Sequence, residues 1–544
     1  MRVNNAHQQP LTVAFHFDAT ACTGLGHFNR CLNLAETFQR RRTKVLFYLS
    51  ADTAGHLKKR KLLDGLSIET VVVGTPSAAC IIKFCHSTNI DVLLIDDYQF
   101  NLKSEIDLRQ HVFLVMIDDH LFDHRSHVIL NHRPSLTVEI LTHEDETQTC
   151  LLGGAKYCLA KATAKVPESG NIVSATVLVH AGGSDLYLPF LNFYKAVLEY
   201  CRLNSISVDV LLADKKAVLP SELKNYVHEN PDTCRTVTFE VPLREELHRY
   251  DAVVGPAGTT TYETLIAGGL PLSFELTDDG RDSKSAWAVL GHLFHLSFSE
   301  VKDPKPSSDI INLFMNNFDK ATELIDQAPC KLDGLGCERG VDDIIRCYEA
   351  HSLPSNFDIS NSIKHSSKVA TEFFEPCNSS DALDFLASRN NERGRSSSTD
   401  PSHRIHWIDH LAWWIDSRIQ RYKVFNESTG SIEGYFWIKQ VILNGETYFT
   451  SGWFPSTGFT LESGLSLGLK IMKAMSQEVN RSNTQGIWVI TMRPENQFAI
   501  QSNRRFGFRP SQLNIDLLEK LYPGSQRSKL LAMSQSMPIK SKST

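Results

Sequence analysis

Short apolar runs that alternate with helical patterns constrain the fold of this 544-residue chain more than any other feature. A strand buried on both faces of a sheet is apolar throughout, and parallel strands need a crossover connection, usually a helix. One series of such strands ends before residue 165 and a second begins after residue 172. The apolar runs span residues 12–17, 44–49, 71–73, 91–95, 111–117, 176–179, 208–212, 236–239 and 252–255. The sequence therefore predicts an α/β fold with two doubly wound parallel sheets.

A change in composition separates a third region from these two lobes. Six of the seven tryptophans cluster between Trp407 and Trp488, where strand-like runs accompany two helical patterns. We therefore expect an α+β domain there, behind a linker rich in Ser, Asn, Lys and Pro. The predicted boundaries are 11–165 for a first lobe with a histidine loop, 172–350 for a nucleotide-binding lobe, 351–368 for the linker, 369–515 for the α+β domain and 516–544 for a partly disordered tail.

Composition argues against several classes of protein. The formal net charge of −6 gives no reason to expect nucleic acid or an anionic membrane as a partner. The first residues lack an apolar signal core, and no stretch approaches the roughly 18 apolar residues that span a bilayer. The 12 cysteines form no Cys-x-x-Cys pair, so we expect reduced thiols, no metal site and a cytoplasmic location.

The first candidate site is a glycine loop between a strand and a helix. Gly24 and Gly26 lie in this loop, and His27 lies at the start of the helix. Glycine allows a ligand to approach the backbone closely. A helix N-terminus favours negative charge and lowers the pKa of a nearby imidazole, so a neutral His27 could accept a proton from water. The alternative is a glycine loop whose histidine only caps the helix.

Two further glycine turns follow in the second lobe. In the stretches 177–185 and 251–269, an apolar run leads directly into a glycine turn. Amides and hydroxyls at a helix N-terminus suit a diphosphate, and Glu263, one turn inside the helix, could hold a ribose hydroxyl. The small residues of this predicted nucleotide site are Gly182, Gly183, Ser184, Gly258, Thr259, Thr260 and Thr261. The alternative is a pair of turns built from small residues for packing.

Residues 11–345 resemble the UDP-sugar hydrolases of bacterial pseudaminic acid synthesis, which are related to the two-lobed MurG-type glycosyltransferases. The stretches that carry the resemblance are residues 18–35, 95–98, 117–119, 181–185 and 257–263. The resemblance implies two Rossmann-like lobes in a GT-B-like arrangement. It also implies metal-free removal of UDP from a 2,4-diacetamido-2,4,6-trideoxy sugar, by attack of water on the anomeric carbon.

The resemblance also assigns roles to individual residues. His27 would activate the water, Asp18 would orient the loop or the sugar, and Tyr98 would contact the sugar or the departing phosphate. The exact sugar stays open, because His16 stands where the family has Arg and residues 278–281 replace an Asn-Gln pair. Two other functions remain: transfer of the sugar to an acceptor in the same cleft, and binding of a nucleotide-sugar without catalysis.

Residues 370–512 resemble the GNAT acyltransferases, and in particular the sugar N-acetyltransferases of the same pathway. The resemblance rests on residues 496–508, which follow a strand, and on His410 and Trp413. It implies N-acetylation with acetyl-CoA as the cofactor. The predicted acetyl-CoA contacts are Gly464, Gly468, Asn496 and Asn503. The glycine stretch at 462–468 lacks the usual basic lead residue, so a plain helix start is the alternative.

Overall fold

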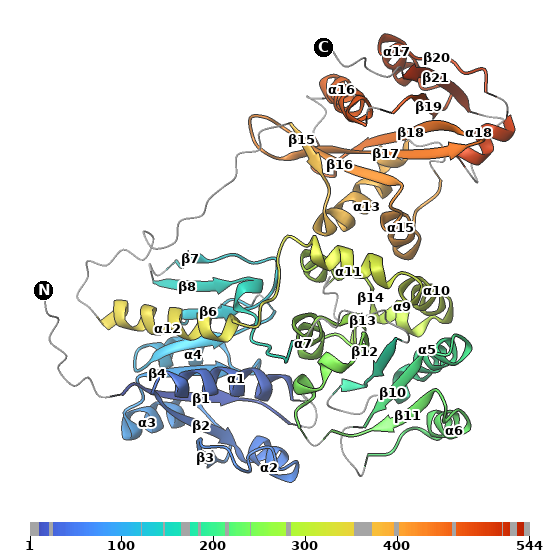
Figure 1. Ribbon diagram of the computed structural model, residues 1–544. Coiled ribbons are helices and arrows are strands. Elements are labelled where there is room, and N and C mark those ends of the chain that lie inside the picture. The colour runs from blue at the N-terminus through green and yellow to red at the C-terminus, as the bar shows by residue number, and fades with distance from the viewer. Residues whose placement is uncertain are drawn as a thin grey trace, which may run out of the picture. The chain divides into compact units, whose positions relative to one another are not determined.

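The computed structural model divides the chain into two compact units, Met1–His365 and Ser366–Thr544. Figure 1 labels the helices and strands of both. The structure describes residues 10–20, 25–120, 122–144, 147–164, 175–182, 187–212, 217–239, 241–278, 284–352, 373–396, 402–459, 464–482, 484–513, 515–522 and 530–537. The predicted linker, residues 351–368, lies outside these residues from residue 353 on.

Eight strands form the sheet of the first lobe, in the order β3-β2-β1-β4-β5-β6-β8-β7. Neighbouring strands are parallel except for the β7–β8 pair. The strands are β1 (Thr12–Phe17), β2 (Lys44–Ser50), β3 (Glu69–Val73), β4 (Val92–Asp96), β5 (Phe113–Ile117), β6 (Val128–Asn131), β7 (Glu139–Thr142) and β8 (Gln148–Gly153). The helices are α1 (Gly26–Arg40), α2 (Ala51–Lys59), α3 (Ala78–Thr88) and α4 (Leu102–Arg109).

Successive side chains of β1 point to opposite faces of this sheet, and helices cover both faces. Phe15 shares an apolar cluster with Phe38 of α1, whereas its neighbour Ala14 shares another with Ile81 of α3. Burial on both sides explains why the run at 12–17 is apolar and why it matches β1 residue for residue.

The second lobe repeats the topology of the first. Its six strands lie in the order β11-β10-β9-β12-β13-β14, and all neighbouring pairs are parallel. The strands are β9 (Thr176–Val179), β10 (Ser207–Leu211), β11 (Cys234–Val237), β12 (Ala252–Pro256), β13 (Leu270–Phe274) and β14 (His295–Leu296). The helices are α5 (Leu191–Leu203), α6 (Ser221–Glu229), α7 (Thr259–Ala267), α8 (Lys284–Val289), α9 (Phe298–Lys302), α10 (Pro304–Met315) and α11 (Phe318–Asp326). Both lobes thus contain the 3-2-1-4-5-6 strand order of Rossmann sheets, which confirms the predicted α/β fold with two Rossmann-like lobes.

The last helix of the unit, α12 (Gly336–Ser352), differs from the sequence prediction. The predicted boundary placed residues 336–350 in the second lobe, but Val341 and Ile344 belong to the apolar core of the first. Figure 1 shows α12 beside β6 and β8 of the first lobe. The chain enters this helix through a tight contact, since a Cβ on Gly336 would lie only 2.1 Å from the carbonyl oxygen of Cys158.

A seven-stranded sheet forms the centre of the second unit, in the order β15-β16-β17-β18-β19-β21-β20. Only β18 and β19 are parallel; the other neighbours are antiparallel. The strands are β15 (Phe374–Pro376), β16 (Ile419–Phe425), β17 (Ile432–Leu443), β18 (Glu446–Pro455), β19 (Gly486–Met492), β20 (Arg509–Pro510) and β21 (Leu531–Met537). The helices are α13 (Ala382–Asn390), α14 (Glu392–Ser396), α15 (Trp407–Trp414), α16 (Gly464–Arg481), α17 (Gln497–Arg505) and α18 (Ile515–Leu521).

Strand β21 corrects the predicted end of this domain. Residues 531–537 were assigned to a partly disordered tail, yet they pair with all of β19 from Gly486 to Met492. The segment is rich in Ser, Gln and Met and carries a weak strand pattern by itself. It becomes a strand because it fills the position between β19 and β20, where both of its edges find partners.

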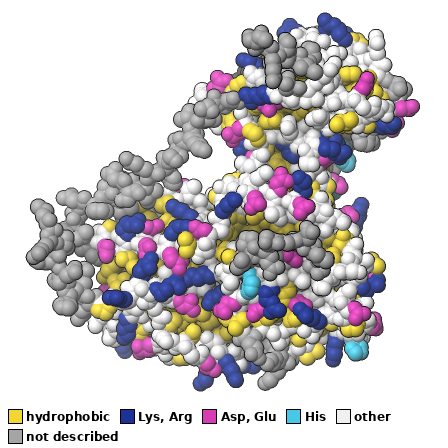
Figure 2. Space-filling view, in the orientation of Figure 1, with side chains coloured by type: hydrophobic (Ala, Val, Ile, Leu, Met, Phe, Trp, Pro, Cys, Tyr) yellow, Lys and Arg dark blue, Asp and Glu magenta, His cyan; other side chains and the backbone are white. Residues whose placement is uncertain are grey.

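The surface agrees with the mixed charge of the sequence. On the face shown in Figure 2, basic and acidic side chains are interspersed over the described residues of the first unit. Among the described residues, no helix is both long and apolar enough to cross a membrane.

Candidate functional site

His27 meets the carboxyl end of β4 at the start of α1. Strands β1 and β4 are parallel neighbours, so the loop that follows β1 lies beside Asp96, the last residue of β4. The Nδ1 atom of His27 lies 2.7 Å from the Oδ1 atom of Asp96 and 3.0 Å from its carbonyl oxygen. His27 is only 7 % exposed. Both contacts occupy Nδ1, so a proton taken from water would go to Nε2.

A buried arginine fixes this pair. Arg30 lies one turn after His27, and its Nε and Nη2 atoms donate to the two carboxylate oxygens of Asp96 at 2.5 and 2.6 Å. Its Nη1 donates to Asp119 Oδ2 at 2.6 Å. Burial alone would raise the pKa of Asp96, but Arg30 and His27 together lower it to about 2. Asp96 is therefore ionised, and its carboxylate only accepts hydrogen bonds.

The pKa of His27 is raised, whereas its position at a helix start predicts a lowered pKa. Burial lowers the pKa of this imidazole, as the helix N-terminus was expected to do, but the adjacent carboxylate of Asp96 outweighs burial and raises the pKa above 6.5. The prediction of a lowered pKa was wrong because it did not place Asp96 beside the ring. A carboxylate-paired histidine is a stronger base, held in one tautomer.

Tyr98 closes the site on the side of the β4–α4 loop. Its hydroxyl donates to Asp119 and accepts from Arg30 Nη2 at 3.2 Å. Its ring stands edge-on to His27, with 4.7 Å between ring centroids. Tyr98 thus lies beside His27 and is 39 % exposed, and its contact with a sugar or a phosphate stays a prediction.

Asp18 lies at the same edge but is bonded within the first lobe. Its backbone NH donates to the carbonyl oxygen of Asp96 at 3.3 Å, and its Oδ1 accepts from the hydroxyl of Thr53 in α2 at 3.2 Å. It thereby holds the chain where the histidine loop begins. Gly24 lies outside the described residues.

The second predicted site faces the first across the two lobes. A Cβ built on Gly26, the first residue of α1, would lie 3.8 Å from the hydroxyl oxygen of Thr259, the first residue of α7. Thr261 Oγ1 accepts from the NH of Gly258 at 3.3 Å, which caps α7, while Thr259 and Thr260 are partly exposed. Two helix N-termini thus approach one another, and each favours an anion.

The other residues of the predicted nucleotide site lie in two different settings. Gly182 has φ of 75°, a conformation that favours glycine, and Gly183 and Ser184 lie outside the described residues. Glu263 is 5 % exposed, and burial raises its pKa to about 8, partly offset by Arg244. Glu263 is therefore neutral near pH 7, and its contact with a ribose stays a prediction.

Side chains from both lobes contact one another beside this site. Arg244 of the second lobe donates through Nη1 to Asn33 Oδ1 on α1. The ring of His132, just after β6, stands edge-on to Tyr262 of α7 with 5.3 Å between centroids. These contacts hold the start of α7 against the first lobe.

Sequence reasoning assigned no role to Arg30, Asp96 and Asp119. A signal was present: Arg30 lies three residues after His27 on one helix face, Asp96 is the last residue of β4, and Asp119 lies two residues after the end of β5 in the same sheet. Among the described residues, no group of three His, Cys, Asp or Glu side chains is placed to hold a metal ion.

The predicted acetyl-CoA residues of the second unit are partly engaged in the fold. Gly464 begins α16 and Gly468 lies inside it, whereas residues 460–463 lie outside the described chain. Asn496 caps α17 by accepting from the NH of Ala499 at 3.1 Å. Asn503 is 8 % exposed and donates to the sulfur of Met492 at 3.8 Å. Their contacts with acetyl-CoA stay predictions.

The sequence matches no protein-family model and no curated protein. Among solved structures, a UDP-N-acetylglucosamine 2-epimerase matches at 12 % identity over 64 % of this chain and all of its own, with a TM-score of 0.41. The glycotransferase of kitacinnamycin matches at 13 % identity over 63 % of this chain and 100 % of its own, with a TM-score of 0.43. The S. aureus MnaA–UDP structure matches at 10 % identity over 64 % of this chain and 100 % of its own, with a TM-score of 0.43.

Proposed function

We propose that the first unit hydrolyses a UDP-linked 2,4-diacetamido-2,4,6-trideoxy sugar to the free sugar and UDP, with His27 as the general base. One observation carries the proposal: the Asp96-paired His27 directly follows Gly26, where an added Cβ would lie 3.8 Å from the hydroxyl oxygen of Thr259 at the start of α7. A positioned base and donors for a leaving diphosphate are what removal of UDP by water requires.

In the proposed reaction, His27 donates its Nδ1 proton in a hydrogen bond to Asp96, so Nε2 carries the lone pair. Nε2 takes a proton from water while the water oxygen bonds to C1 of the sugar. The bond between C1 and the phosphate oxygen breaks, and its electron pair leaves with the diphosphate. The imidazolium then releases its proton to solvent, and free sugar and UDP result.

The second lobe would stabilise the charge that develops on the leaving group. Amides and hydroxyls at the start of α7 can donate to phosphate oxygens, and the N-terminal ends of α1 and α7 both favour negative charge. Gly183 and Ser184 are proposed to complete this cradle. Glu263, neutral near pH 7, would both donate to and accept from the ribose.

NMR of UDP-sugars incubated with the protein tests this proposal. We expect UDP and a reducing sugar to form without an acceptor, and His27→Ala to lower the rate by about 10²–10⁴-fold. His228→Ala, at an exposed histidine of α6, is the matched control and should keep the full rate. Full activity of His27→Ala would mean that the base is misassigned. A labelled acceptor would indicate a glycosyltransferase, and unaltered UDP-sugar despite binding would indicate a binding protein.

A second activity, acetyl-CoA-dependent N-acetylation, is proposed for the second unit. The parallel pairing of β18 and β19 covers only Tyr448–Thr450 and Ile487–Val489, although β18 runs on to Pro455 and β19 to Met492. Beyond Thr450 and Val489 the two strands no longer pair with one another, and we propose that an extended amide chain such as that of CoA binds there. Acetyl-CoA titrated onto the full chain should bind. When an amino-sugar nucleotide is added as the acceptor, the acetyl group should pass to its amine and free CoA should be released. Absence of any binding would refute this activity.

A further inference from the structure

One tyrosine of the second lobe combines a buried side chain with a hydroxyl that has no partner. Tyr262 lies in the first turn of α7, directly after the three threonines at the start of that helix. It is only 9 % exposed, and its hydroxyl makes no hydrogen bond within the described part of the chain. Native proteins pair most of their buried polar groups, because an unpaired one costs free energy. A ligand that accepts from this hydroxyl would supply the missing partner.

Two aromatic side chains hold the ring of Tyr262 in place. The imidazole of His132, from the first lobe, stands edge-on to this ring with 5.3 Å between ring centroids. The indole of Trp287 in α8 lies 4.7 Å from it on the same measure. Trp287 and Tyr262 also share an apolar cluster with Cys158. The phenol is thus oriented before a ligand binds, so a hydrogen bond from it costs little conformational entropy.

The hydroxyl of Tyr262 lies near charged groups of the reaction centre. Burial raises the pKa of this phenol well above 10, so it keeps its proton near pH 7 and can donate a hydrogen bond. The charges of Asp119 and Arg30 also act on it, Asp119 raising the pKa and Arg30 lowering it. Both of these residues bond to the hydroxyl of Tyr98, whose ring stands beside His27. Tyr262 therefore reaches from the second lobe towards the surroundings of the proposed base.

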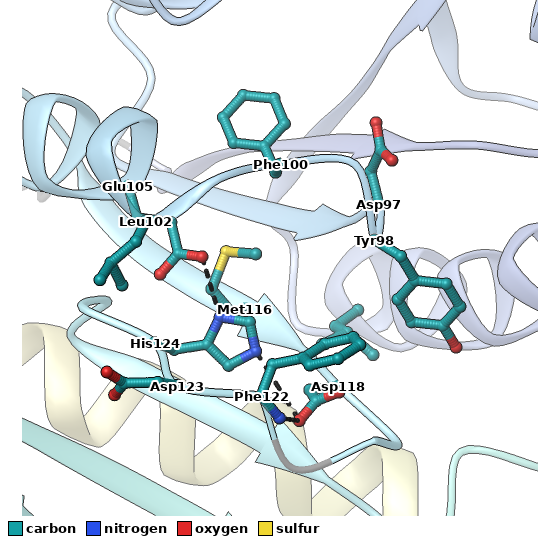
Figure 3. Close-up of a pocket in the computed structure, with 11 residues that line it drawn as sticks. Asp97, Tyr98, Phe100, Leu102, Glu105, Met116, Asp118, Phe122, Asp123 and His124 are labelled. Carbon is teal, nitrogen blue, oxygen red and sulfur yellow. Dashed lines mark hydrogen bonds and ion pairs between the residues drawn. The ribbon is translucent and has the colours of Figure 1, made fainter. Parts of the chain in front are cut away.

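In the first lobe, by contrast, the polar side chains around the reaction centre are paired with one another. Figure 3 shows His124 between Glu105 and Asp118, with its Nδ1 2.9 Å from Glu105 Oε1 and its Nε2 3.7 Å from Asp118 Oδ2. Tyr98, which lines the same pocket, donates to Asp119. These donors already serve carboxylates, so the second lobe is the better source of a donor to a phosphate oxygen.

We propose that Tyr262 is a further catalytic residue, whose hydroxyl donates a hydrogen bond to the phosphate oxygen that leaves C1 of the sugar. This rests on the proposed function and deepens it, because it names the group that acts on the breaking bond. The phenol keeps its proton throughout. The electron pair of the broken bond stays on the phosphate oxygen, and the hydroxyl stabilises the charge that develops there. The base, His27, thus comes from one lobe and the donor from the other.

The substitution Tyr262→Phe tests the proposal, because it removes the hydroxyl and keeps the ring. With the UDP-linked 2,4-diacetamido-2,4,6-trideoxy sugar, we expect kcat to fall about 10²–10³-fold, as when one donor to a developing charge is lost. KM should change less than about threefold, since the bond strengthens only in the transition state. The melting temperature should stay equal or rise, because the hydroxyl has no partner to lose.

The matched control is Tyr200→Phe, on α5 of the same lobe. It removes a hydroxyl that donates to Asn316 at the surface, and it should keep the full kcat. An unchanged kcat in Tyr262→Phe would overturn the proposal. A loss of kcat that comes with a lowered melting temperature would mean that Tyr262 is a structural residue.

A second measurement, ³¹P NMR of bound UDP, tests the same contact without turnover. The β-phosphate of UDP carries the oxygen that leaves C1. Its resonance should differ between the wild type and Tyr262→Phe, and the α-phosphate resonance should not; an unchanged β-phosphate resonance would contradict the contact. If the β-phosphate responds but no UDP-sugar is hydrolysed, the contact stands and the proposed hydrolysis fails. Hydrolysis at full rate by Tyr262→Phe would mean the reverse.

Discussion

The two lobes of the first unit share a strand order and place opposite chemistry at the same edge of their sheets. The first lobe gathers fixed charges there: Arg30 is buried between two ionised aspartates, and one of them holds His27. The second lobe offers threonine hydroxyls and helix amides, together with Glu263, which burial keeps neutral near pH 7. The topology brings strand ends together, but the side chains on them decide what each edge can do.

The two sheet edges carry different side chains, charged in the first lobe and neutral in the second, and this difference fits the ligand proposed for each edge. A general base needs an ionised partner that fixes its tautomer and stabilises its protonated form. A nucleoside diphosphate brings its own negative charge, so the lobe that cradles it gains from neutral donors and would lose from an ionised carboxylate. Variants that exchange these characters test the comparison.

The largest effect is expected where the charge of the first lobe is removed. Asp96→Asn should lower kcat by about 10³–10⁴-fold while UDP binding persists, because an amide no longer fixes the Nδ1–H tautomer. It should also lower the pKa of His27, since Asp96 is the group that raises it. The neutral form of the base is active, so the rate rises with pH through this pKa, and in the variant the rise should come at lower pH.

Residual activity and its pH profile measure both effects in one experiment. Asp107→Asn, at an exposed carboxylate of α4 in the same lobe, is the control and should change neither. Loss of kcat with an unshifted pH profile would mean that Asp96 does not act through the imidazole. Persisting UDP binding shows that the variant is folded.

A smaller effect is expected at Glu263 of the second lobe, where the pH dependence of stability reports whether the carboxyl group is neutral. The pKa of Glu263 is raised by burial from 4.5 to about 8, so its contribution to stability is complete below pH 4.5 and is lost as pH rises towards 8. At pH 7 the loss amounts to about 3 kcal/mol. Glu263→Gln should remove this pH dependence, which denaturant unfolding at pH 5 and pH 7 measures.

The same substitution should preserve UDP binding at pH 7, because glutamine resembles the neutral acid. Wild-type affinity should fall as pH rises through about 8, and that of Glu263→Gln should not. If the variant loses UDP binding at pH 7, the residue acts there as an anion and the contrast between the lobes is wrong.

The smallest effect is expected at a single hydroxyl of the cradle. Thr259→Val keeps the shape of the side chain and removes one donor to phosphate, so UDP should bind about fivefold more weakly with kcat nearly unchanged. Thr322→Val, at an exposed threonine of α11, is the matched control for titration calorimetry. A change in kcat alone would place Thr259 with the base and not with the diphosphate.

Residues near one another in the chain allowed much of this architecture to be predicted. The runs at 12–17 and 176–179 match β1 and β9, because strands buried on both faces need little beyond their own apolar sequence. The position of His27 at a helix start was likewise visible. The pKa of that histidine was not, since Asp96 lies 69 residues away and reaches it only because β4 pairs with β1.

The sequence by itself determined two doubly wound sheets and the glycine loops at their edges, because apolar periodicity and turn residues act over a few positions. Only the tertiary structure decided that α12 joins the first lobe, that residues 531–537 fill a sheet and that Arg30 bridges two aspartates. Those outcomes depend on which distant segments leave a face, an edge or a charge without a partner. Burial and charge compensation are properties of the assembled core, and no local pattern encodes them.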